Sequence, residues 1–241
     1  MIQLENIHLI KRDKKLLSDV NLIINEGDKI ALLGKSGAGK STLISILNGT
    51  SNPTKGNIKI FNRNLSELNI YVKRKIGTIW QDLRLIEELS SEQNVNCGLL
   101  GKENLIFAIK NLLNISSFRK AHKCLELCKL SKTIYSSNIK DISGGQRQRI
   151  AIARSIIQEP EILYADEPFN NLDPQTSMHI KNLFLKYQDS KDIKFPKTLL
   201  FSIHNLDHLD GFNRVIGLKN GTIKFDLKIN QFKEDCLNKI Y

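Results

Sequence analysis

The sequence has little of the chemistry that marks membrane-spanning, secreted or fibrous proteins. It contains no run of about 18 consecutive apolar residues, so we expect no membrane-spanning helix. The first residues lack a basic stretch leading into an apolar segment, so we expect no signal peptide and a place in the cytosol. The 4 cysteines form no Cys-x-x-Cys pair, which favours buried free thiols over a metal site. With 41% hydrophobic and 25% charged residues among 241, the composition is that of a globular protein with its own core.

The charge of the chain is strongly one-sided. Lys and Arg total 36 against 25 acidic residues, a net charge of +11. Such a balance suits polyphosphate, nucleic acid or an anionic membrane surface. The lysines are scattered, however, and no basic stripe with interleaved aromatic residues occurs. We therefore favour a solvated basic surface and expect no nucleic-acid partner.

Short apolar runs bounded by turn residues predict the strands of an α/β core. A different, helical spacing of apolar residues extends from about residue 86 to residue 157. We therefore predict one folding unit over residues 1–241, with a core at about 1–85 and 158–241 and a helical subdomain at about 86–157. The predicted strands are residues 22–24, 30–33, 58–61, 162–165, 198–203, 214–218 and 222–225, and the predicted helices lie within residues 105–113, 118–128 and 145–157.

A glycine-rich run directly follows the predicted strand 30–33 and precedes a helical segment. The run is Gly34-Lys35-Ser36-Gly37-Ala38-Gly39-Lys40-Ser41-Thr42, which matches the G-x-x-x-x-G-K-[ST] pattern. Its glycines let backbone N–H groups approach phosphate oxygens, and a helix N-terminus adds partial positive charge. We expect Lys40 to reach the β- and γ-phosphates and the Ser41 hydroxyl to bind Mg²⁺.

Two carboxylates end the predicted strand 162–165. Asp166 can face a Mg²⁺ held beside Ser41, and Glu167 can point at the attacking water as a base or positioning group. Acidic pairs after apolar runs are common, so this pair alone is a weak signal. Together with the glycine-rich run it becomes a strong one.

A second candidate anion site is the stretch Ser143-Gly144-Gly145-Gln146-Arg147-Gln148-Arg149. Ser143 and Gln146 have the spacing of a capping box. An ordinary helix start would not need the two glycines, which weaken a helix by roughly 1 kcal/mol each. They leave backbone N–H groups open to an anion. Because the first site already holds the phosphates, this one predicts a nucleotide supplied from elsewhere.

Taken together, these motifs resemble an ATP-binding subunit of an ABC transporter, over about residues 1–227. The resemblance implies a RecA-like P-loop NTPase core, an N-terminal antiparallel β subdomain and an inserted helical signature subdomain. It implies a homodimer that holds two MgATP, each P-loop facing the signature helix of the other subunit. Gln81 resembles the glutamine that contacts Mg²⁺ and the attacking water, and His204 the switch histidine on the γ-phosphate. Asp173, in Asn170-Asn171-Leu172-Asp173, matches the acid of the D-loop.

The chain departs from the family pattern in three places. Ile142 stands where the signature usually has leucine, and Asn170-Asn171 replaces the usual small residues of the D-loop. The aromatic residue that usually stacks on adenine falls at Ile10 or Lys11, with His8 as an alternative platform.

Within the family, residues 94–101 and 214–221 look most like ATPases of phosphonate- or phosphite-type importers. That resemblance implies integral-membrane permease subunits, an external solute-binding protein and a place on the cytoplasmic face of the inner membrane. Two alternatives stay open: an ATPase of lipoprotein-release or cell-division type, and a soluble ABC ATPase acting on nucleic acid.

Overall fold

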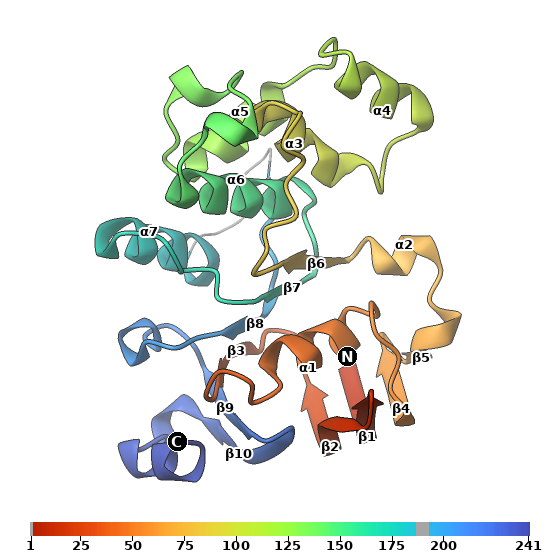
Figure 1. Ribbon diagram of the computed structural model, residues 1–241, viewed down its shortest axis with the longest axis vertical. Coiled ribbons are helices and arrows are strands. Elements are labelled where there is room, and N and C mark those ends of the chain that lie inside the picture. The colour runs from red at the N-terminus through yellow and green to blue at the C-terminus, as the bar shows by residue number, and fades with distance from the viewer. Residues whose placement is uncertain (1, 187–192) are drawn as a thin grey trace. The chain divides into compact units, whose positions relative to one another are not determined.

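The computed structural model describes residues 2–186 and 193–241 (Figure 1). Two compact units make up the chain, one of residues 2–76, 164–167 and 197–241 and the other of residues 77–163, 168–186 and 193–196. The predicted boundaries near residues 86 and 157 lie inside the second unit. In the described part of the chain, no helix is both long and apolar enough to cross a membrane.

Two sheets carry the strands. The first has the order β2-β1-β4-β5, and the second contains β10-β9-β3-β8 and then β7 and β6. The strands are β1 (Ile2–Lys11), β2 (Lys14–Ile24), β3 (Lys29–Leu33), β4 (Lys55–Ile60), β5 (Arg63–Asn64), β6 (Ile76–Ile79), β7 (Ile162–Ala165), β8 (Thr198–Ser202), β9 (Arg214–Lys219) and β10 (Thr222–Lys228).

The first sheet is antiparallel and forms the N-terminal part of the first unit. In β1, Ile2, Leu4 and Ile7 are buried, while the residues between them are partly or fully exposed. Such alternation is typical of a sheet with one face on a core. Ile2 lies opposite both Ile24 and Ile60, so the predicted strands 22–24 and 58–61 join through β1.

The second sheet brings the ends of several strands to one edge. β3 is parallel to both β8 and β9, with Leu32 opposite Ser202 and Ile216. The carboxyl ends of these strands therefore reach the same edge, where open α/β sheets bind ligands. β9 and β10 form the predicted hairpin across Asn220 and Gly221, both at positive φ as a type I′ turn requires.

The helices are mostly in the second unit. α6 packs against α3 and α5, and it begins at the capping box predicted for Ser143 and Gln146. The buried face of α5 carries free Cys124, and burial raises the pKa of this thiol to about 12. The α-helices are α1 (Lys40–Leu47), α2 (Ile70–Lys73), α3 (Ser91–Asn96), α4 (Leu105–Leu112), α5 (Arg119–Leu127), α6 (Gly144–Ile157) and α7 (Pro174–Leu185). The predicted α/β class, with an antiparallel N-terminal sheet and a helical region, is confirmed.

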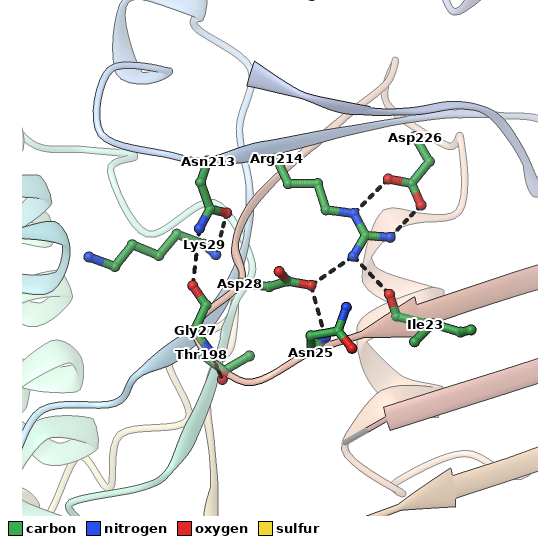
Figure 2. A network of polar contacts seen from close by, with 9 residues as sticks. All are labelled: Ile23, Asn25, Gly27, Asp28, Lys29, Thr198, Asn213, Arg214 and Asp226. Atoms are coloured by element: carbon green, nitrogen blue, oxygen red, sulfur yellow. Dashed lines mark hydrogen bonds and ion pairs between the residues drawn. The ribbon is translucent and has the colours of Figure 1, made fainter. Parts of the chain in front are cut away.

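Arg214 ties the strands of the first unit together at the end of β3 remote from the glycine-rich run (Figure 2). Its guanidinium donates two hydrogen bonds to the Asp226 carboxylate, at 2.6 and 2.5 Å, and one to Asp28 at 2.7 Å. A fourth reaches the backbone carbonyl of Ile23 at 2.8 Å. The planar fork of an arginine is suited to such bidentate binding, and a lysine is not. This network joins β2, β9, β10 and the turn before β3, and so fixes where β3 starts.

Replacing Arg214 should therefore lower the stability of the protein substantially. We expect Arg214→Ala to reduce the free energy of unfolding by about 1–3 kcal/mol, because the half-buried Asp28 carboxylate and the more exposed Asp226 carboxylate both lose their cation. Arg214→Lys should recover only part of this loss, since one ammonium cannot serve both carboxylates and the carbonyl. Urea unfolding followed by circular dichroism measures the effect.

The control is Lys197→Ala, which removes an exposed ion pair with Glu26 in the same unit. We expect a change below about 0.5 kcal/mol there. Equal unfolding midpoints for the Arg214→Ala, Lys197→Ala and wild-type proteins would contradict a structural role for Arg214.

Candidate nucleotide site

The glycine-rich run curls tightly at the end of β3. A Cβ on Gly34 would lie 2.4 Å from the carbonyl oxygen of Leu218 in β9, so only glycine fits there. The N–H of Gly221, in the β9–β10 turn, donates to the carbonyl of Ala38 at 2.9 Å. Gly39 has φ +106 and precedes α1 without a side-chain cap. The β9–β10 hairpin therefore holds the loop through this hydrogen bond. Because no side chain caps α1, its first backbone amides can bind an anion.

Lys40 lies inside this curl rather than on the surface. Its ammonium donates to the carbonyls of Gly34 at 2.8 Å and Lys35 at 3.1 Å, and the residue is 5% exposed. Burial lowers the pKa of Lys40, while the nearby carboxylates of Glu167 and Asp166 act in the opposite direction. A desolvated cation held at one place is the arrangement expected of a group that binds phosphate oxygens.

The remaining members of the run differ in exposure. Lys35, Ser36 and Gly37 are exposed, as is Ser41 in the first turn of α1. Thr42 is half-buried. The Ser41 hydroxyl is therefore accessible to a ligand bound at the loop.

The two carboxylates after β7 are held by a serine of β8. The Ser202 hydroxyl donates to Asp166 Oδ1 at 2.7 Å and accepts the N–H of Glu167 at 2.8 Å. Asp166 is 3% exposed, and Ser202 is fully buried. Sequence reasoning did not single out Ser202, although a polar residue inside the apolar run 198–203 was the available signal.

Glu167 and His204 contact each other at this edge of the sheet. His204 Nε2 lies 2.5 Å from Glu167 Oε1, and Glu167 has the positive φ of +53, which is rare for a residue with a side chain. Backbone strain of this kind clusters at functional sites, where it orients a side chain that the chain would otherwise place differently. Lys40, Asp166, Glu167 and His204 thus gather in one unit.

A separate group of predicted residues lies in the second unit, around the start of α6. Ser143 and Gln146 form a complete capping box, with each side chain bonded to the other's backbone N–H. Gly144 has open space around its Cα. Gly145, by contrast, is also required by packing, because a Cβ there would lie 2.7 Å from the carbonyl of Asn171. Packing against Asn171 is therefore a reason for Gly145 that the sequence did not predict, and binding of an anion by the amides stays a prediction.

Asp173 follows Asn171 and starts α7. Its carboxylate accepts the N–H of Thr176 at 2.9 Å, and hydrogen bonds from the Thr176 side chain and then from this N–H lower the pKa of Asp173. Asp173 is therefore a helix cap with an exposed carboxylate.

Gln81 precedes a strained turn that α6 holds in place. Leu83 and Arg84 both have positive φ, and Arg154 of α6 donates to both of their carbonyls, at 2.5 Å each. The Arg84 guanidinium lies over the ring of Trp80 at 3.6 Å from its centroid. Sequence reasoning missed Arg154, since nothing in its spacing signals a bond to a turn some 70 residues earlier. One helix thus carries the signature at its start and holds the Gln81 turn near its end.

The residues considered for adenine lie along β1 of the first unit. Ile10 and Lys11 end this strand and are exposed. His8 is half-buried, and its Nδ1 accepts the N–H of Asp19 at 3.4 Å. None of the three is an aromatic platform of the usual kind.

Comparisons with known proteins identify the family of the chain. The sequence profile of the ABC transporter family matches residues 17–170. The phosphonates import ATP-binding protein PhnC of Fusobacterium nucleatum is 33% identical over 100% of this chain and 98% of its own length. PhnC of Lactococcus lactis subsp. lactis is 34% identical, again over 100% of this chain and 98% of its length.

A solved structure is similar in fold as well. A dimeric ATP-binding cassette in a post-hydrolysis state, bound to ADP and Pi, superposes with a TM-score of 0.82 at 28% identity. The match covers 96% of this chain and 100% of that one. The chain belongs to the ABC transporter family, and it is an ATP-binding cassette ATPase.

The contact between Gly34 and Leu218 gives a direct test of the loop. We expect Gly34→Ala to weaken ATP binding at least tenfold, because the added methyl group collides with a backbone oxygen and forces the loop to shift. Calorimetric titration with ATP measures the affinity.

Gly37→Ala is the matched control. Gly37 also has positive φ, at +77, but a Cβ there meets nothing within 4 Å. The backbone strain of about 1–2 kcal/mol is present with and without ATP, so it should lower the stability of the protein and leave ATP affinity within about threefold of wild type. Equal ATP affinities for the two variants would show that the approach to Leu218 does not shape the site.

Proposed function

We propose that this chain is the ATP-hydrolysing subunit of an importer for phosphonate, phosphite or a related small oxyanion. The observation that carries the proposal is the match over the whole chain to phosphonates import ATP-binding proteins. The gathered cation, carboxylates and histidine of the first unit support the hydrolytic part.

Hydrolysis requires positioning and charge stabilisation more than covalent chemistry. In the proposed mechanism the amides of residues 34–42 and the Lys40 ammonium bind the phosphates. Glu167 orients the attacking water and accepts its proton, and His204 contacts the γ-phosphate. The short contact from His204 to Glu167 supports a shared task.

Mg²⁺ suits the oxygen donors of this unit. The Ser41 hydroxyl and the Asp166 carboxylate would hold it, and hard oxygen ligands with substrate phosphates are what Mg²⁺ prefers. When bound, Mg²⁺ neutralises charge that develops on the phosphates. Ser202 would keep Asp166 oriented through its hydrogen bond.

A second copy of the chain completes the proposed site. The start of α6 offers free space and backbone amides to an anion, and it consists of Ser143, Gly144, Gly145 and Gln146. The amides of residues 34–42 would already bind the ATP of the same chain, so the start of α6 would bind a different ATP. In the homodimer this helix start would contact the ATP held by the partner, with Asp173 near the interface. The related cassette of known structure is dimeric, which supports this arrangement.

The proposed assembly includes integral-membrane permease subunits and an external solute-binding protein. The ATPase would act at the cytoplasmic face of the inner membrane, with the Gln81 turn sensing the permease. Arg154 supports such coupling, because it joins this turn to the signature helix.

The variant Glu167→Gln tests hydrolysis and cargo together. We expect purified Glu167→Gln to bind ATP normally, to turn over about 10²-fold more slowly and to accumulate as an ATP-bound dimer, because the base is lost while the phosphate contacts remain. Phosphate release and light scattering measure these effects. In the native host, the same substitution should abolish growth on a phosphonate as sole phosphorus source and leave growth on inorganic phosphate unchanged.

His204→Ala should also bind ATP and hydrolyse it poorly, and His208→Ala, four residues further on, is its control. Near-normal turnover by Glu167→Gln would remove Glu167 from the proposed role. Lost turnover with intact growth on phosphonate would instead disprove the cargo and favour a lipoprotein-release or division-type complex.

A further inference from the structure

The helix α4 of the second unit exposes most of its apolar residues. A helix on a globular protein normally buries an apolar stripe and exposes polar residues. In and just after α4, most of the exposed residues are aliphatic, and Lys110 and Asn114 are exposed beside them. The aliphatic ones are Leu105, Ile106, Ile109, Leu112, Leu113 and Ile115, which we call the α4 face. Leu105 is 75% exposed and Leu112 65%.

The side of α4 that meets the protein carries half-buried Phe107 and Ala108 and the buried Asn111. Asn111 is 2% exposed, and its amide donates to the carbonyl of Gln93 at 3.1 Å. The Gln93 amide returns a hydrogen bond to the Asn111 carbonyl at 2.7 Å. Asn104 caps the start of the helix through the N–H of Phe107. The helix is therefore fixed to α3 by specific hydrogen bonds, in the orientation that turns its aliphatic residues outward.

The sequence on both sides of α4 is rich in basic residues. Residues 100–123 contain five cations against one carboxylate, Glu103, with Lys110 on α4 itself. Two of the five, Lys102 and Lys120, pair with Glu159. Single exposed apolar residues are ordinary, but a contiguous aliphatic face marks an interaction site.

We propose that the α4 face inserts into the surface of an anionic membrane. An aliphatic face with lysine and arginine around it is the pattern of helices that lie in the headgroup region, with basic side chains reaching the phosphates. Protein interfaces favour Trp, Tyr and Arg as central contacts, and Leu is under-represented there. The α4 face contains only Leu and Ile, which favours lipid over a protein partner. The proposal does not depend on the proposed cargo.

Vesicle flotation tests the proposal on the purified full chain. We expect the wild type to float with vesicles of phosphatidylglycerol and phosphatidylethanolamine, to bind phosphatidylcholine vesicles weakly, and to bind less at high salt. Ile109→Gln/Leu112→Gln should reduce the bound fraction at least tenfold, because two aliphatic side chains no longer leave water. Its ATP affinity and circular dichroism spectrum should be unchanged.

The control is Ile23→Gln/Ile70→Gln, which makes the same kind of change at two exposed isoleucines of β2 and α2. This variant should float like the wild type. Equal loss in both double variants, or no wild-type binding to anionic vesicles, would overturn the proposal. So would a wild type that self-associates, or binds a permease, through the α4 face while ignoring lipid.

Tryptophan fluorescence measures insertion directly, whereas the double variants measure a loss of vesicle binding. In a Trp80→Phe background, Leu112→Trp places the chain's only tryptophan on the α4 face. Its emission should shift to the blue with anionic vesicles and be quenched by brominated acyl chains. Ile23→Trp in the same background should show neither effect. An unchanged spectrum for Leu112→Trp would contradict insertion.

Discussion

The site depends on holding the Lys40 cation inside a loop that is too tight for any side chain at Gly34. A buried ammonium requires partners, and the carbonyls of Gly34 and Lys35 supply them at 2.8 and 3.1 Å. This is feasible because the loop closes against Leu218 of β9 and is supported by the β9–β10 turn. The Arg214 network fixes the other end of β3 and so the place where the loop starts.

The motifs with fixed spacing were predictable from the sequence, and they agree with the structure. The strand 162–165, the hairpin at Asn220 and Gly221 and the capping box of Ser143 each have a local cause that the sequence displays. The class of fold followed from the same signals. Helix α3 was missed because its residues are polar, although a capping box at Ser90 and Gln93 was visible.

The supporting contacts were not predictable, because they join residues far apart in the chain. Ser202 meets Asp166 across two strands, and Arg154 meets Leu83 across two elements of the second unit. The carbonyl of Asn171 leaves no room for a side chain at Gly145, and this contact is visible only in the folded backbone. The position of α4 likewise involves hydrogen bonds between Asn111 and Gln93, which are 18 residues apart. The composition indicates a basic surface, but it does not show where on that surface aliphatic side chains are exposed.

The two compact units divide the predicted chemistry between them. The first has the P-loop, both carboxylates and His204, while the second has the signature start, Asp173 and the Gln81 turn. Within the second unit, α6 links the signature start to the Gln81 turn, because it begins after Ser143 and Arg154 near its end donates a hydrogen bond to that turn.

The central proposal is that hydrolysis requires a second copy of the chain. The most direct measurement is ATP turnover per subunit over a range of protein concentrations, with the oligomeric state recorded at each by light scattering. Turnover should be very low where the protein is monomeric and should rise to a plateau as dimer forms. A constant turnover per subunit down to concentrations where only monomer exists would contradict the proposal, because one chain would then complete its own site.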